Sequence, residues 1–128
     1  MSYIAPILQI TKENNNFRTV VHTGIKSQVV LMSMLPNEDI GAEVHHHTEQ
    51  TIVLVEGKAL SILDGVNREV YAGDLVVVPP GIMHNFINNG DTALKLYTVY
   101  APANHIDGRI HKTKADAEAD LEDEAVGE

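Results

Sequence analysis

Apolar residues between Phe17 and Ala101 recur in short runs, without the longer three-to-four-residue periodicity of amphipathic helices. The runs are rich in Val, Ile, Leu and Thr, and Gly, Asn, Asp or Pro stands between them, as expected for strands joined by turns. The predicted strands cover residues 28–35, 51–55, 59–63, 68–71, 75–78, 84–87 and 93–100. This regular spacing predicts an all-β protein, an antiparallel sandwich or barrel.

The C-terminal stretch has a different composition. Seven acidic residues and no basic residue lie between Ala115 and Glu128, so most of the formal net charge of −9 belongs to this stretch. Residues 113–125, rich in Ala, Glu and Asp, have the composition of a helix. We therefore expect residues 1–112 to form the barrel domain and residues 113–128 to form a solvated acidic tail without chemistry of its own.

Length and composition limit the classes of protein that remain. A chain of 128 residues is long enough for one domain with one core. No apolar run approaches the roughly 18 residues of a membrane span, residues 1–10 do not resemble a secretory signal, and the acidic charge disfavours nucleic acid. We expect a cytoplasmic protein without a membrane or nucleic-acid partner. Because there is no cysteine, any metal site has to use imidazole and oxygen ligands.

The segment most specific for function is GDLVVVPPGIMHNFIN, residues 73–88. It resembles the second conserved motif of the cupin superfamily, which places Gly, Pro, Gly, His and Asn at fixed intervals. Every position matches: Gly73, Pro79, Gly81, His84 and Asn88. The resemblance implies a double-stranded β-helix, or jelly-roll, barrel with His84 as a metal ligand just inside it.

The first cupin motif, with ligands His, His and Glu followed by a Gly, should lie upstream in residues 41–57, GAEVHHHTEQTIVLVEG. Counting back from Gly57 places Glu43, His45 and Gln50 at the three ligand positions. A second register uses His45 and His47 but leaves the gap to Gln50 one residue short. A third register starts at Val44, which cannot bind a metal.

Strand alternation would put Glu43, His45 and His47 on one face, and we expect His46 and Glu49 to face outward. His47 remains an alternative to Glu43. The predicted metal ligands are Glu43, His45, Gln50 and His84.

This mixed set of imidazole, carboxylate and amide donors suits one divalent ion of iron, manganese, nickel or zinc, with positions left open for a substrate. Glu43, His45 and His84 make a two-histidine, one-carboxylate set, which favours a dioxygenase-like enzyme acting on a small organic molecule. The presence of Gln50 also allows a second function, that of a sugar or sugar-phosphate isomerase or epimerase, because the site resembles that of type I phosphomannose isomerases. A third possibility is a non-catalytic cupin that binds a metal or small molecule.

Two segments outside the motifs carry further expectations. His105 and His111 flank Asp107-Gly108-Arg109, and we expect this segment to fold over a barrel mouth or onto a partner subunit. Small cupins commonly associate through sheet faces or exchanged N-terminal strands. We therefore predict a homodimer, with residues 3–10 as a candidate exchanged strand.

Overall fold

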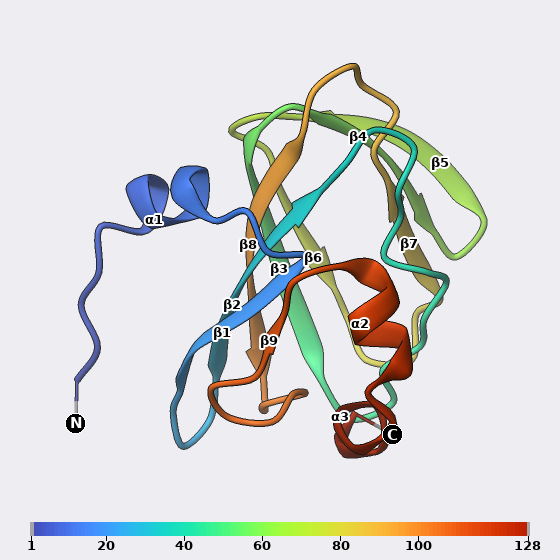
Figure 1. Ribbon diagram of the computed structural model, residues 1–128. Helices are drawn as coiled ribbons and strands as arrows, with labels where there is room; N and C mark the ends of the chain where they lie inside the picture. The colour runs from blue at the N-terminus through green and yellow to red at the C-terminus, as the bar shows by residue number, and fades with distance from the viewer. Residues whose placement is uncertain (1, 128) are drawn as a thin grey trace.

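The computed structural model describes residues 2–127 and consists of two antiparallel sheets that face each other, with three short helices outside them (Figure 1). The strands of the larger sheet, in spatial order, are β6 (Leu75–Val78), β3 (Glu49–Glu56), β8 (Leu94–Ala101), β2 (Gln28–Met34), β1 (Arg18–Thr23) and β9 (Ile110–His111). The smaller sheet has the order β5 (Val66–Tyr71), β4 (Lys58–Leu63) and β7 (His84–Ile87). The helices are α1 (Ile7–Glu13), α2 (Lys114–Ala119) and α3 (Leu121–Val126), and within residues 2–127 no helix has the length and apolar character needed to span a membrane.

The predicted all-β, antiparallel architecture is confirmed, because each predicted strand lies within an observed strand or overlaps most of it. The two-residue period explains the core. In β3, Gln50, Ile52 and Leu54 are buried between the sheets, and the residues between them are half-buried on the outer face. The apolar core between the sheets includes Val30, Met32, Met34, Ile52, Leu54, Phe86, Leu94 and Leu96.

The turns use glycine where the backbone requires it. Asp64 and Gly65 connect β4 to β5 with φ angles of 50° and 80°, the conformation of a type I′ hairpin. Gly57, between β3 and β4, has a φ of 86°, and a Cβ atom there would lie 3.0 Å from the carbonyl oxygen of Ala93. Gly57 therefore serves two purposes, since it allows both the turn and the close approach of β8.

We expect Gly57→Ala to lower the free energy of unfolding by about 2 kcal/mol, because the left-handed backbone and the contact with Ala93 both disfavour a side chain. Gly65→Ala is the matched control: its φ is also positive, but the added Cβ meets no atom within 4 Å, so we expect about 1 kcal/mol. Urea denaturation measures both. Equal losses in the two variants would show that the close approach at Gly57 has no energetic consequence.

The N-terminal segment does not form the expected strand. Residues 7–13 form α1, which lies against β8 and β3. Thr11 is buried and Ile7 and Ile10 are half-buried, at the spacing of one helix face. Lys95 of β8 donates hydrogen bonds to Asn14 at the end of the helix and, at 2.9 Å, to the side chain of the next residue. An exchanged strand over residues 3–10 is therefore wrong, because the helical face is already packed on the chain's own sheet.

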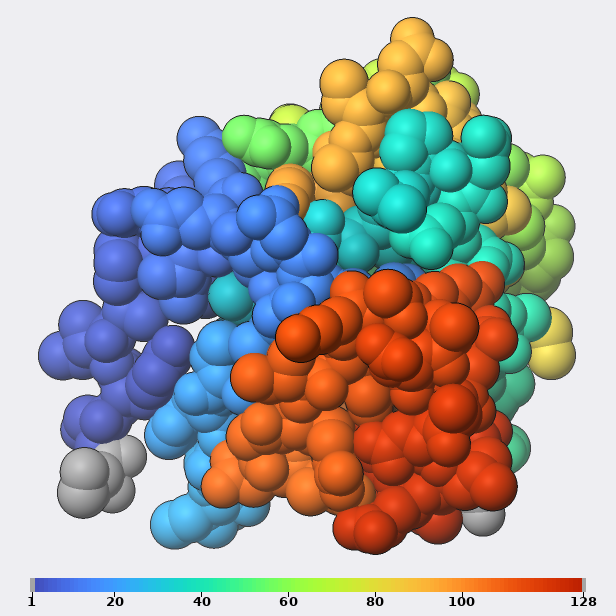
Figure 2. Space-filling model, in the orientation of Figure 1, coloured from blue at the N-terminus to red at the C-terminus, as the bar shows by residue number. Residues whose placement is uncertain are grey.

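The C-terminal residues fold back over one end of the barrel (Figures 1 and 2). Thr113 and Asp116 form a capping box at the start of α2, and Asp120 caps α3. Asp123 is only 3% exposed and accepts hydrogen bonds from His105 Nδ1 at 2.8 Å and from the backbone N–H of Ile106 at 2.7 Å. The helical composition expected for residues 113–125 is confirmed by α2 and α3, and most of their side chains are exposed, but the buried Asp123 attaches the segment to the barrel. The segment covers the barrel mouth of its own chain, one of the two arrangements expected from the sequence.

Candidate metal centre

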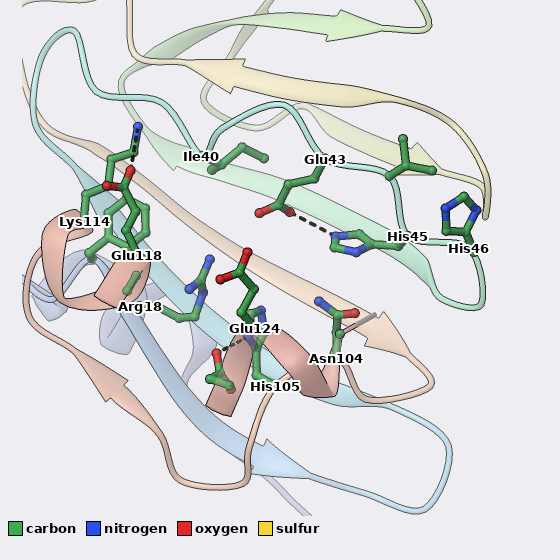
Figure 3. Close-up of a pocket in the computed structure, with 15 residues that line it drawn as sticks. Arg18, Ile40, Glu43, His45, His46, Asn104, His105, Lys114, Glu118 and Glu124 are labelled. Carbon is green, nitrogen blue, oxygen red and sulfur yellow. Dashed lines mark hydrogen bonds and ion pairs between the residues drawn. The ribbon is translucent and has the colours of Figure 1, made fainter. Parts of the chain in front are cut away.

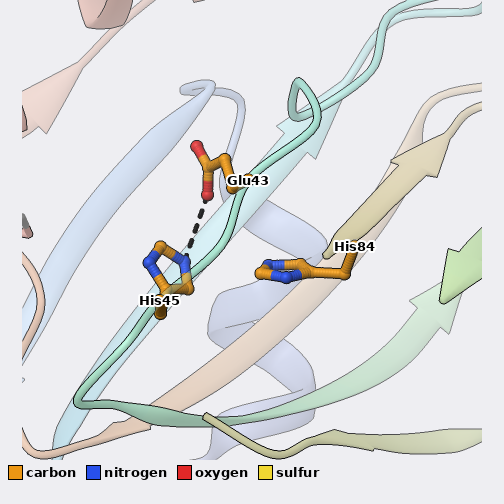
Figure 4. Close-up of side chains that lie close together, drawn as sticks. All are labelled: Glu43, His45 and His84. Carbon is orange, nitrogen blue, oxygen red and sulfur yellow. Dashed lines mark ion pairs between the residues drawn. The ribbon is translucent and has the colours of Figure 1, made fainter. Parts of the chain in front are cut away.

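Glu43, His45 and His84 converge at the covered end of the barrel (Figure 4). Glu43 and His84 form an isolated β-bridge, in which each backbone N–H donates to the other's carbonyl at 2.9 Å. Gly81 of the Pro-Pro-Gly turn donates to the carbonyl of His45 at 2.8 Å. The backbone of the second motif thus holds the backbone of the first motif in place. As a result, one potential ligand atom from each of the three side chains lies within 4.8 Å of the other two.

The ring of His84 has a defined orientation. Its Nδ1 lies 3.1 Å from the carbonyl oxygen of Ile82. Because a carbonyl only accepts, Nδ1 carries the proton and Nε2 presents a lone pair. That Nε2 atom is buried and has no hydrogen-bond partner among residues 2–127. The side chain is therefore oriented as a ligand would be.

Two further buried atoms of the predicted ligand set lack hydrogen bonds within the described part of the chain, His45 Nε2 and Gln50 Oε1. His45 Nε2 lies 3.2 Å from Glu43 Oε2, an ion-pair distance that lacks the angles of a hydrogen bond. Each unsatisfied buried polar atom costs roughly 1–3 kcal/mol. Imidazole nitrogens and amide and carboxylate oxygens are all ligands of divalent transition metals, so the residues present fit the ion that the cupin resemblance implies.

The electrostatics favour the protonation states that bind metal. Burial lowers the pKa of His84 and so favours neutral imidazole. Burial alone would raise the pKa of Glu43, but the contact with His45 and the charges of His45, Arg18 and His84 together bring this pKa below its usual value. A neutral His84 and an ionised Glu43 are the forms in which these side chains coordinate a cation.

Gln50, the fourth predicted ligand, also points into the barrel interior. It is buried in β3 opposite Tyr100 of β8, and the ring of Tyr100 meets the ring of His45 edge-on at a centroid distance of 5.9 Å. The Gln50 amide donates from Nε2 to Thr98 Oγ1 at 3.1 Å, which fixes the direction of Oε1. Gln50 thus faces inward, as its predicted role as a ligand requires.

The alternative ligand His47 lies elsewhere. Residues 43–47 do not form a strand: Glu43 makes a single bridge, and the chain bends at His46 and His47. Both of these histidines are exposed, and so is Glu49. Strand alternation therefore fails to place His47 beside His45, and the structure assembles the register that contains Glu43.

A cavity of about 480 Å³ adjoins Glu43 and His45 (Figure 3). Its walls come from the start of β1, the segment 40–46, the loop after β8 and the C-terminal helices. The lining includes Arg18, Ile40, Glu43, His45, His46, Asn104, His105, Lys114, Glu118, Asp123 and Glu124. The acidic tail is thus one wall of this cavity.

Two residues of this region, Arg18 and Asp123, were not predicted from the sequence, and His105 was expected only as part of a segment over a barrel mouth or on a partner subunit. His105 lies between Asp123 and the hydroxyl of Tyr100, which is 3.3 Å from Nε2. Burial works against the charged form of Asp123, yet the hydrogen bonds from His105 and the Ile106 N–H lower the pKa of Asp123 to about 2. Spacing gave no signal for these residues, since Arg18 and Asp123 lie at opposite ends of the chain.

A second group of potential ligands, His111, Asp120 and Asp123, is already internally paired. His111 Nε2 lies 2.8 Å from Asp120 Oδ2, and Arg109 Nε lies 3.4 Å from the same oxygen. Asp123 is occupied by His105. These side chains hold the C-terminal helices on the barrel.

The cupin domain model matches residues 30–100, more than half of the chain, and the protein therefore belongs to the cupin family. The YrkC protein of Bacillus subtilis is 45% identical over 123 residues, which cover 91% of this chain and 66% of YrkC; the chain thus spans slightly less than two thirds of that relative. The crystal structure of BH2720 from Bacillus halodurans is 38% identical with a TM-score of 0.91 and covers 93% of this chain and 95% of that chain.

A predicted oxalate decarboxylase from Thermotoga maritima is a more distant structural neighbour. It is 22% identical with a TM-score of 0.59, over 61% of this chain and 69% of that chain. This likeness shows the shared fold alone. Together with the closer matches it confirms the jelly-roll barrel predicted from the second motif.

Proposed function

We propose that this cupin is a metal-dependent enzyme acting on a small organic substrate, with one divalent ion held by Glu43, His45, Gln50 and His84. The observation that carries the proposal is a set of buried ligand atoms without a hydrogen-bond partner among residues 2–127, His45 Nε2, His84 Nε2 and Gln50 Oε1, together with a cavity beside His45 and Glu43. Structural metal sites are closed by protein ligands, whereas a site that adjoins a cavity leaves room for a substrate.

Iron, manganese, nickel or zinc bound there would supply Lewis acidity or oxygen activation at open coordination positions. The chain's own residues prepare the site. Ile82 fixes the ring of His84, Thr98 fixes the amide of Gln50, and the C-terminal helices cover the barrel mouth and limit the access of water. The two-histidine, one-carboxylate set favours dioxygenase-like chemistry.

A second candidate, sugar or sugar-phosphate isomerisation, is favoured by Gln50. Its inward oxygen, which has no hydrogen-bond partner within the described residues, adds an amide to the set of ligand atoms, as in the site of the type I phosphomannose isomerases. Isomerisation consumes no oxygen, so the two reactions are separable by one measurement.

The test is to load the protein with iron(II), manganese, nickel or zinc in turn and to screen small organic acids, phenols and sugars for oxygen uptake and for isomerisation. Oxygen consumption that requires both metal and substrate supports the dioxygenase-like reaction, and isomerisation without oxygen uptake supports the second candidate. A protein that binds metal but turns over no substrate in either screen would be a binding protein, and the enzyme proposal would fail.

We also propose that the chain forms a homodimer through the outer face of the larger sheet. Leu75 and Val77 of the edge strand β6 are 60% and 46% exposed, and Leu75 continues a row formed by Val53 and Tyr97 on the neighbouring strands. Exposed apolar side chains on an edge strand, beside the part of this face that α1 leaves uncovered, favour association with a second copy.

In light scattering after size-exclusion chromatography, we expect the wild type to elute as a dimer and the double variant Leu75→Asp, Val77→Asp to elute as a monomer. Val66→Asp is the control, because Val66 is also exposed, at 68%, but lies on β5 of the other sheet. A monomeric wild type, or a variant that stays dimeric, would show that this face is not the interface.

A further inference from the structure

Arg18 is a buried cation in the wall of the cavity (Figure 3). It is 7% exposed, and its Nε atom has no hydrogen-bond partner among residues 2–127. Nη1 lies 3.3 Å from Nδ1 of His111. No carboxylate in the described part of the chain lies within ion-pair distance of the Arg18 guanidinium.

The other cation of the cavity is in a different situation. Lys114 forms an ion pair with Asp39 and lies 3.9 Å from Glu118. Its charge is therefore neutralised within the protein. Lys114 provides an internal comparison for Arg18, because both side chains line one cavity and only one of them has a carboxylate partner.

Four carboxylates line the same cavity, those of Glu43, Glu118, Asp123 and Glu124, and none of them lies within ion-pair distance of Arg18. Asp123 accepts from His105 and from the Ile106 N–H, and Glu43 is directed at His45. A divalent ion at the candidate centre would take up the charge of Glu43 and add positive charge to the same cavity. The guanidinium lies over the ring of Phe17, 5.4 Å from its centroid, which leaves its in-plane N–H donors free of this contact. A buried charge without a carboxylate partner is costly, so the Arg18 guanidinium favours an anionic ligand.

We propose that Arg18 binds the carboxylate of a small organic acid that also carries oxygen donors for the metal centre. This inference rests on the proposed function and names the substrate class of that site. A guanidinium group matches a carboxylate through two parallel hydrogen bonds, and the unpartnered Nε is one of the donors that such a pair uses. The cavity of about 480 Å³ has room for an acid of a few carbon atoms.

The experiment measures binding of malate by isothermal titration calorimetry to zinc-loaded and metal-free protein, with butane-1,2,4-triol as the uncharged analogue. We expect the wild type to bind malate and not the triol. Arg18→Gln should weaken malate binding by about tenfold or more, because the charge-assisted pair is lost. Arg18→Lys keeps the positive charge but loses the paired N–H donors of the guanidinium. Its affinity for malate should therefore lie between those of the wild type and Arg18→Gln. Lys114→Met, the matched control, should change the affinity by less than about twofold.

Malate binding that is unchanged in Arg18→Gln, triol binding as tight as malate binding, or no malate binding by the wild type would each overturn the inference. Zinc content and thermal stability of each variant establish that it is folded and loaded. If Arg18→Gln does not fold, the malate affinity of Arg18→Lys and the comparison of malate with the triol test the role of Arg18 instead. A wild type that takes up no divalent ion contradicts the proposed function instead, and malate binding to the metal-free protein then still tests Arg18.

Discussion

His84→Ala is expected to abolish the stabilisation of this protein by divalent metal ions. An ion present at about 100 times its dissociation constant should stabilise the wild type by roughly 2.7 kcal/mol, and the variant should show no such gain. The reason is the position of His84: its buried Nε2 faces the site, its ring is held by Ile82, and its burial keeps the imidazole neutral. Melting temperatures measured with and without each ion give the result.

His47→Ala is the matched control for this experiment. His47 lies two residues from His45 and completes the alternative ligand register, but it is exposed. We expect this variant to keep the full metal-dependent shift. If His84→Ala kept the shift, the ligand assignment would be wrong; if His47→Ala lost it, the ligand set would include His47 in place of Glu43.

Asp123→Ala should lower the free energy of unfolding by about 3 kcal/mol, a large loss for one residue in an acidic C-terminal helix. The substitution removes a buried carboxylate and leaves His105 Nδ1 and the Ile106 N–H without their acceptor. Because these bonds hold α3 on the barrel, hydrogen exchange in α2 and α3 should accelerate as well. Urea denaturation and amide exchange measure the two effects.

Glu122→Ala is the comparison for Asp123, one residue away in the same helix. The side chain of Glu122 is 79% exposed and pairs with Arg109 at the surface, so its loss should cost no more than about 0.5 kcal/mol. Equal stability of the two variants would mean that the C-terminal helices are not anchored through Asp123.

The parts of the structure that the sequence predicts are those determined by local patterns. The strands follow from alternation and turn residues, and the position of His84 follows from the Pro-Pro-Gly turn and the strand that it begins. The choice between Glu43 and His47 was open in the sequence because alternation assumes an extended chain. The bend at His46 and His47 breaks that assumption.

Other features depend on contacts between distant segments. Nothing in the neighbours of Asp123 distinguishes it from the other acids of the tail; it is buried because α3 folds against His105. Arg18 lines the cavity because β1 pairs with β2 and β9 and the helices close over it. Helix α1 was not predicted because the short apolar pattern of this segment fits a strand as well as a helix. What distinguishes the two is its packing on β8, which the sequence does not show.

Elemental analysis of the freshly purified protein shows whether this cupin holds a divalent ion. We expect about one equivalent of iron, manganese, nickel or zinc per chain in the wild type and far less in His84→Ala, with both proteins folded. A folded wild type that contains no stoichiometric divalent metal and gains no stability when these ions are added would contradict this expectation.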